Sequence, residues 1–237
     1  MYPMYYYGNS TQSLLYLLLV VVMIASMFAQ GKVQRTFKKY SGEYAVSRMT
    51  GRDLARELIA RYGTEHVDIT AVNGTLTDHF DPRNNTVGLS TAVYNSSSVA
   101  ALAVTAHEIG HVLQYQEGYG PIRLRNSVLP VAQIGSSMAP WIVILGLFIG
   151  SFNISMIGVY LFGAVLLFQL VTLPVEFNAS ARGLRMLEEG GYVSYEQADG
   201  AKKVLNAAAM TYVWSTIATL ISFLRLLVIA KSNRRRD

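Results

Sequence analysis

An uncharged stretch of 50 residues, 126–175, is the feature that most constrains how this chain of 237 residues can fold. It contains no Asp, Glu, Lys, Arg or His. A helix rises about 1.5 Å per residue and a bilayer core is about 30 Å thick, so the stretch is long enough for two membrane spans. Residues 150–155 are rich in turn-forming residues. We therefore predict a transmembrane hairpin over residues 128–175, which returns the chain to the side of the membrane that it left.

Two further apolar runs strengthen the prediction of an integral membrane protein. The chain is 51% hydrophobic and only 15% charged, against about 25% charged residues in soluble domains. The uncharged run Leu14–Ala29 predicts an N-terminal transmembrane anchor within residues 1–31. We expect it to be retained rather than cleaved as a signal peptide, because no Lys or Arg precedes it and Met27 and Phe28 do not suit a cleavage site. The last run, Val204–Leu224, predicts a fourth span or a helix packed against other helices.

The basic residues predict the orientation of the chain in the membrane. Of the 20 Lys and Arg residues, 15 lie in residues 32–125 and 182–203. Lys and Arg concentrate on the cytoplasmic side of membrane proteins, so we expect both segments there. A fourth span would leave Lys231 and the arginines at 234–236 outside, so the side of the C-terminus stays open. These arginines could also indicate a nucleic-acid or lipid ligand, but beside an apolar run they are more typical of a membrane flank. We expect no nucleic-acid partner.

A small α+β domain is predicted over residues 32–127, between the anchor and the hairpin. Residues 47–64 have apolar side chains at helical spacing, and Thr50 stands three residues before Asp53 in the pattern of a helix-capping box. Val67–Val72 and Thr86–Leu89 have the composition of short strands. We therefore expect an amphipathic helix followed by a small sheet.

A second helix, predicted over Val99–Gln116, carries the sequence His-Glu-Ile-Gly-His at residues 107–111. Histidines four residues apart lie on one helical face, so His107 and His111 can reach a single cation, while Glu108 beside them can deprotonate an activated water. The alternative is that these histidines are core residues and Glu108 a surface charge. Apolar residues surround the motif on nearly every face, and a buried carboxylate is costly unless a cation compensates it. The motif therefore favours a Zn²⁺ site of the hydrolase type.

The third metal ligand has several candidates in the sequence. The chain has no Cys, and no His follows His111. The remaining candidates are an Asp or Glu, or the upstream His66 or His79. Glu117 lies close to the same helix and points away from the motif. Glu176 is the first charged residue after the hairpin, which brings the chain back to the face that it left. We predict that Glu176 is the third ligand, with a carboxylate that merely marks the membrane edge as the alternative.

Several longer stretches carry a resemblance to a known family. These are Tyr5–Gly8, Leu76–Arg83, Ala106–His111, Thr172–Ser180 and Val204–Ala208. In them the chain resembles the YugP-like family of bacterial membrane-associated neutral zinc metallopeptidases over nearly its whole length. More distantly, it is similar to the HtpX and CAAX-prenyl-protease group of membrane gluzincins. In that group the third ligand is the Glu that matches Glu176, and Ser180 stands where the group usually has Asp.

The resemblance implies a fold class and a function. The fold would be a mainly α integral membrane protein with an HExxH zincin-like α+β domain, three to four transmembrane helices, and a third-ligand helix plus a C-terminal apolar helix over residues 176–237. The protein would be a multi-pass zinc endopeptidase of the bacterial plasma membrane, with its site at the cytoplasmic face. Glu108 would be the general base toward a zinc-activated water. Substrates would be membrane or membrane-proximal proteins and peptides.

The sequence leaves other roles open. The chain could be a non-catalytic, zinc-stabilised membrane scaffold or a chaperone-associated factor, although such a site needs no base and Glu108 favours the enzyme. His79, Arg182 and Tyr212 are candidates for stabilising the oxyanion. By analogy with the distant group, Thr86–Leu89 is a candidate edge strand for pairing with an extended substrate. The sequence predicts no oligomeric state.

Overall fold

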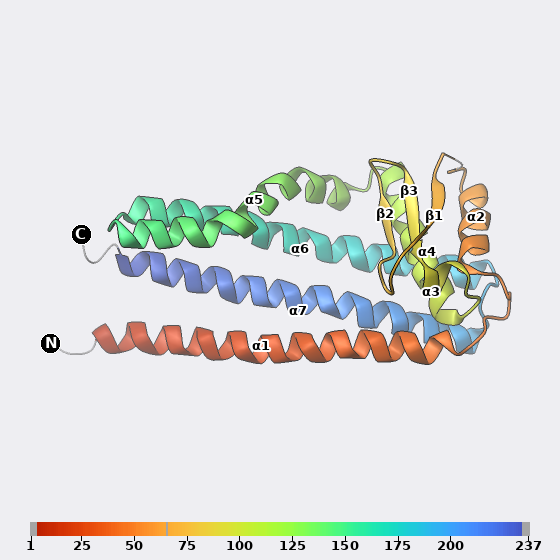
Figure 1. Cartoon of the computed structure of the whole chain (residues 1–237), viewed down its shortest axis with the longest axis horizontal. Helices are drawn as coiled ribbons and strands as arrows, with labels where there is room; N and C mark the ends of the chain where they lie inside the picture. Colours follow the sequence, from red (N-terminus) through yellow and green to blue (C-terminus); the bar gives the residue numbers. More distant parts are fainter. Residues whose placement is uncertain (1–3, 65, 234–237) are drawn as a thin grey trace. The chain divides into compact units, whose positions relative to one another are not determined.

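The computed structural model describes residues 4–64 and 66–233, and in them most of the chain is helical (Figure 1). The helices are α1 (Met4–Ser41), α2 (Gly51–Arg61), α3 (Thr91–Tyr94), α4 (Val99–Gln116), α5 (Gly120–Phe148), α6 (Phe152–Glu189) and α7 (Tyr195–Asn233). In the described part of the chain, one small sheet lies between α2 and α3 in sequence order. The predicted class, a mainly α protein with a small sheet, is confirmed. The arginines at 234–236 lie outside the described residues.

The chain divides into two compact units. The first, here called the apolar unit, is formed by residues 1–28, 123–173 and 211–237. The second, here called the mixed unit, is formed by residues 29–122 and 174–210, and it holds the sheet and the His-Glu-Ile-Gly-His helix.

Among the described residues, four helices are long and apolar enough to cross a membrane, namely α1, α5, α6 and α7. This is the upper end of the predicted three to four, and the last apolar run, Val204–Leu224, is part of α7. The predicted turn of the hairpin is shorter than expected, because α5 ends at Phe148 and α6 begins at Phe152. Gly150 between them has a φ of 74°, a left-handed conformation that glycine adopts without steric cost.

Helices α5 and α6 of the apolar unit approach each other to backbone contact. A Cβ added to Gly135 would lie 2.4 Å from the carbonyl oxygen of Leu161, and one added to Gly146 would lie 2.4 Å from the amide nitrogen of Ser155. At Gly158 the corresponding distance, to the carbonyl oxygen of Ala139, is 2.8 Å. Glycine is therefore required at these three contacts, since any side chain would push the two helices apart.

The sheet of the mixed unit has the strand order β1-β3-β2. Strand β1 (Asp68–Val72) is parallel to β3 (Thr86–Ser90), and β2 (His79–Asp81) is antiparallel to β3. The expectation that Thr86–Leu89 forms an edge strand is wrong, because β3 is paired on both sides. The turn at residues 82–85 folds β2 back onto β3 in the register His79 opposite Gly88. With only three residues, β2 has too short a pattern to be recognised in the sequence.

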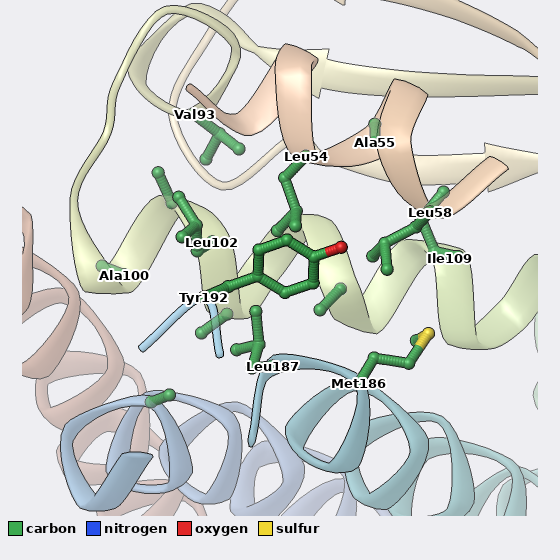
Figure 2. Packing of buried hydrophobic residues seen from close by; sticks show 14 of the residues in the cluster. Leu54, Ala55, Leu58, Val93, Ala100, Leu102, Ile109, Met186, Leu187 and Tyr192 are labelled. Atoms are coloured by element: carbon green, nitrogen blue, oxygen red, sulfur yellow. The ribbon is translucent and has the colours of Figure 1, made fainter. Parts of the chain in front are cut away.

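The hydrophobic core of the mixed unit lies between α2, α4 and the C-terminal part of α6 (Figure 2). Helix α2 is shorter than predicted, but the capping box is present: the Thr50 side chain accepts a hydrogen bond from the Asp53 amide, and the Asp53 side chain accepts one from the Thr50 amide. The apolar face of α2, with Leu54 and Leu58, turns toward α4. The ring of Tyr192, from the segment between α6 and α7, fills the space between them. This packing fixes the position of α4.

Candidate metal centre

Helix α4 carries the motif and is buried along most of its length. The Ser98 side chain caps its first turn by accepting a hydrogen bond from the Ala101 amide at 3.2 Å. Apolar side chains surround the motif, and Ala103, Ala106 and Ile109 are fully buried. A buried helix of this kind positions its polar side chains precisely, because they cannot move without disturbing the core.

The predicted metal ligands come together from two helices. Nε2 of His107, on α4, lies 3.4 Å from Oε2 of Glu176, on α6, and Nε2 of His111 lies 3.7 Å from the same oxygen. One ligand atom of each residue lies within 4.8 Å of the others, so the group could hold one metal ion. Among the residues that the structure describes, neither His66 nor His79, the alternative third ligands, belongs to this group.

Two glycines allow α4 and α6 to come close enough for these ligand atoms to meet. A Cβ on Gly110 would lie 2.6 Å from the carbonyl oxygen of Ala179, and one on Gly183 would lie 2.9 Å from the carbonyl carbon of Ala106. Gly110 belongs to the motif itself, and Ala179 is one helical turn beyond Glu176. The contact therefore brings the helix with two imidazoles against the helix with the carboxylate.

Both imidazoles have a partner on the side of the ring opposite the metal group. Nδ1 of His107 lies 3.1 Å from Oγ of Ser180, and Nδ1 of His111 lies 3.0 Å from Oε1 of Gln114. Both Nε2 atoms therefore remain directed toward Glu176, whose side chain is 5% exposed. Two imidazole nitrogens and one carboxylate oxygen are a donor set of the kind that catalytic zinc sites use. The residues present thus fit a zinc ion.

Glu108 is buried beside this group and is not part of it. Burial raises the pKa of the Glu108 carboxyl, and the nearby charges of Asp78 and Glu176 add to the rise, while the two motif imidazoles oppose it. For His111, burial lowers the pKa, but the carboxylates of Glu176 and Glu108 outweigh burial and raise it above the ordinary value. Several carboxyl groups therefore lie close enough to influence one another, and a divalent cation among them would stabilise their ionised forms.

Two of the three candidates for stabilising the oxyanion lie in different units, His79 in the mixed unit and Tyr212 in the apolar unit. Nδ1 of His79 lies 2.9 Å from the carbonyl oxygen of Thr77, and its ring packs over Gly88 of the neighbouring strand. Tyr212 lies on α7, within the apolar unit. Their role stays a prediction.

Arg182, the third candidate, is engaged by its neighbours. Its Nε donates to Oδ1 of Asn178 at 2.8 Å, and its two terminal nitrogens contact the carboxylate of Glu117 at 2.8 and 2.7 Å. Glu117 thus pairs with an arginine and lies outside the metal group, as predicted. Gln114, which is fully buried, was not among the site residues predicted from the sequence. The sequence did indicate a role for this residue, because a Gln on an otherwise apolar helix needs hydrogen-bond partners when it is buried.

Comparison with known proteins agrees with this geometry. A family model described as "Putative neutral zinc metallopeptidase" matches residues 15–231. The chain belongs to this family. It is also 40% identical over 222 residues to the "Putative membrane protease YugP" of Bacillus subtilis (strain 168), a match that covers 93% of this chain and 99% of the relative. No solved structure matches the chain.

The family membership confirms the resemblance seen in the sequence motifs and the prediction of zinc as the cofactor. With four apolar helices among its described residues, the chain is a membrane member of a zinc metallopeptidase family. The match to the family model spans α4 and the part of α6 that bears Glu176, so it includes all three residues of the metal group.

Proposed function

We propose that the chain is a membrane-embedded zinc endopeptidase in which His107, His111 and Glu176 hold the metal and Glu108 is the general base. The observation that carries this proposal is the convergence of both imidazole Nε2 atoms on one buried carboxylate oxygen, at 3.4 and 3.7 Å. The residues come from positions 65 apart in the sequence and from different helices. Membership of a zinc metallopeptidase family and similarity to a Bacillus protein named as a membrane protease support the same function.

The proposed mechanism assigns a task to each residue of the site. A bound zinc ion supplies a Lewis acid that polarises the scissile carbonyl and makes water a better nucleophile. His107 and His111 keep their Nε2 atoms directed inward, because Ser180 and Gln114 hold their Nδ1 atoms. The Glu108 carboxylate accepts a proton from the attacking water and delivers it to the leaving amide nitrogen. The raised pKa of Glu108 makes its carboxylate a stronger base than an exposed one, which favours its taking the proton from water.

Substitution of Glu108 separates the enzyme from the zinc-stabilised scaffold. Glu108→Gln has nearly the same volume and removes only the base, so we expect the purified protein to keep about one zinc ion per chain. Peptide cleavage is expected to fall by at least about two to four orders of magnitude, the typical contribution of general acid–base catalysis. A variant that cleaves as fast as the unmodified protein would rule out Glu108 as the base.

The third ligand is tested by zinc content across three variants. Glu176→Ala removes a buried carboxylate of the metal group and is expected to empty the site. Glu189→Ala, at the last residue of the same helix, is the matched control and should retain zinc, since Glu189 is exposed. If His79→Ala empties the site while Glu176→Ala leaves it full, the ligand is the upstream histidine and the proposal is wrong.

We further propose that the metal group faces the cytoplasm. The support is the position of 15 of the 20 Lys and Arg residues within residues 32–125 and 182–203. In a chain without native cysteines, a single cysteine at Asn84 should resist membrane-impermeant thiol reagents in intact cells, whereas one at Asn153 should react. Labelling of the Asn84 position in sealed cells would reverse this orientation.

The proposed substrates are membrane or membrane-proximal proteins and peptides. Their identity can be sought by mass spectrometry of membrane proteins from cells that carry either the unmodified protein or Glu108→Gln. Peptides with new termini that are present only with the unmodified protein would be direct or indirect products. An identical set of termini in both strains would contradict proteolysis in the membrane.

A further inference from the structure

Gln114 connects one motif histidine to the helix that bears the third ligand. It lies on α4, three residues after His111, and its side chain is fully buried. Its Oε1 is 3.0 Å from Nδ1 of His111. Its Nε2 donates to the carbonyl oxygen of Val175 at 2.8 Å and to Oδ1 of Asn178 at 3.0 Å, both on α6. A single amide therefore bonds to His111 at one end and to α6 at the other.

The partners on α6 determine which way this amide points. The backbone carbonyl of Val175 can only accept a hydrogen bond. The guanidinium of Arg182 can only donate, and its Nε lies 2.8 Å from Asn178, so Asn178 must present its oxygen there. That oxygen is also the atom that faces Gln114. The amide nitrogen of Gln114 must therefore lie on the α6 side, since a reversed amide would place its oxygen against two acceptors.

The orientation of Gln114 in turn determines the tautomer of His111. With the amide nitrogen held by α6, the amide oxygen faces Nδ1 of His111. Two acceptors cannot form a hydrogen bond with each other, so Nδ1 must carry the proton. A neutral imidazole that is protonated at Nδ1 has its lone pair on Nε2, the atom directed toward Glu176.

His107 lacks an equivalent constraint. The partner of its Nδ1 is the hydroxyl of Ser180, at 3.1 Å. A hydroxyl both donates and accepts, so Ser180 can bond to Nδ1 in either tautomer. The two histidines of the motif thus differ: the surroundings of His111 select one tautomer, and those of His107 accept both.

We propose that Gln114 is a positioning residue that fixes the tautomer of His111 and so presents its Nε2 lone pair to the metal. This inference rests on the proposed function, because His111 is a metal ligand only there. The ion pair between Arg182 and Glu117 belongs to the same line of contacts, since it holds the guanidinium that orients Asn178. Hydrogen bonds therefore connect the Arg182–Glu117 ion pair, through Asn178 and Gln114, to Nδ1 of His111.

Two substitutions of Gln114 separate this role from packing. Gln114→Leu loses the two donations to α6 and the acceptor for Nδ1 of His111. Gln114→Glu faces the acceptor oxygens of Val175 and Asn178, so it fits as a neutral carboxylic acid. Its O–H then donates toward α6, and its carbonyl oxygen accepts from Nδ1 of His111. We expect Gln114→Leu to weaken zinc affinity about 10- to 100-fold, the usual effect of removing a partner of a ligating histidine. Gln114→Glu should stay within a few-fold of the unmodified protein. Affinity is measured with the full chain in detergent, by competition for zinc with a chelator. Equal losses in both variants would mean that Gln114 matters only for packing, and the inference would be wrong.

A spectroscopic measurement on the unmodified protein tests the contact between Gln114 and His111 without any substitution of Gln114. Zinc on Nε2 leaves the proton of His111 on Nδ1 whatever its neighbour, so the informative property is the hydrogen bond of that proton to Oε1 of Gln114. In the zinc-loaded protein with ¹⁵N-labelled histidine, the Nδ1 proton, assigned by its loss in His111→Ala, should be shifted downfield and protected from exchange with solvent. An Nδ1 proton that exchanges as freely as that of an unbonded imidazole, or a proton on Nε2 with the metal on Nδ1, would overturn the inference even if Gln114→Leu does not fold. If the unmodified protein binds no zinc, the proposed function itself fails. If it binds zinc and Gln114→Leu binds it equally tightly, only the role of Gln114 is refuted.

Discussion

Replacement of Gly110 by alanine tests whether the close approach of α4 and α6 sets the geometry of the metal group. The added Cβ would lie 2.6 Å from the carbonyl oxygen of Ala179, and contact becomes ordinary only at about 3.4 Å. Because the opposing atom belongs to the backbone of α6, it cannot rotate away. One helix must therefore shift by about 0.8 Å, the difference between these two distances.

Two effects of opposite sign decide the stability of Gly110→Ala. Alanine is favoured over glycine within a helix by about 1 kcal/mol. Overpacking of a well-packed core costs about 1–3 kcal/mol. We therefore expect a net loss of about 0–2 kcal/mol in stability. A separate loss is expected in zinc binding, since metal–ligand distances tolerate deviations of only about 0.2 Å. A shift of 0.8 Å beside His111 and Glu176 exceeds that tolerance about fourfold, and we expect zinc affinity to fall by at least about tenfold.

The assay is zinc competition and thermal unfolding of the detergent-purified protein, with Gly31→Ala as the matched control. Gly31 lies within α1, and the nearest atom to an added Cβ is the end of the flexible Arg35 side chain, at 3.8 Å. Gly31→Ala gains the same helix propensity without a clash, so it should keep full zinc affinity and equal or greater stability. Gly183→Ala, with its contact at 2.9 Å to the backbone of α4, should weaken zinc binding in the same direction. If the Gly110→Ala variant binds zinc as tightly as the Gly31→Ala variant, the close approach of α4 and α6 does not set the geometry of the metal group.

Three further predictions concern zinc binding and the cap of α2. Chelation of zinc should lower the unfolding temperature of the unmodified protein, because a ligand that binds only the folded state stabilises that state. The unfolding temperature of Glu176→Ala should not respond to the chelator and is the control. An unchanged unfolding temperature in the unmodified protein would contradict the metal site. Because the pKa of His111 is raised above the ordinary 6.5, a proton competes with zinc for Nε2, so zinc affinity should increase as pH rises through 6.5 and level off only above the raised pKa. Competition titrations across pH measure this, and affinity that is independent of pH below 6.5 would speak against it. Thr50→Ala removes the side chain that caps α2 and should cost about 1 kcal/mol of stability, whereas an unfolding temperature equal to that of the unmodified protein would show that this cap contributes little.

Much of this architecture could be predicted from local patterns in the sequence. The absence of charge over residues 126–175 is a property of composition, and it predicts membrane-spanning helices regardless of how they pack. The capping residues Thr50 and Ser98 act within one helical turn, so their sequence neighbours suffice to identify them. The spacing of His107 and His111 predicts a shared helical face for the same reason.

What the sequence could not predict depends on contacts between distant segments. The central position of β3 depends on the pairing of β2, a strand of three residues, with it across a turn. The role of Gln114 depends on Val175 and Asn178, which are more than 60 residues away and lie beyond the hairpin. Glu176 could be predicted because the hairpin must return the chain to one face. The contacts of Asn178 with Gln114 and of Ser180 with His107 could not be predicted, since an Asn or Ser near a membrane edge has no distinctive pattern.

The glycine contacts between α5 and α6 restrict how hydrophobic molecules can move past the apolar unit. At Gly135, Gly146 and Gly158 the two backbones touch, and these positions are distributed along the hairpin. A lipid tail or a helical peptide is several ångströms wider than the space that such a contact leaves. To pass between α5 and α6 it would have to separate the hairpin at all three contacts and expose their packed backbones to lipid. The seam between these two helices is therefore closed to lateral entry. A larger residue at any one of the three glycines would separate the helices only there, and the other two contacts would still close the seam.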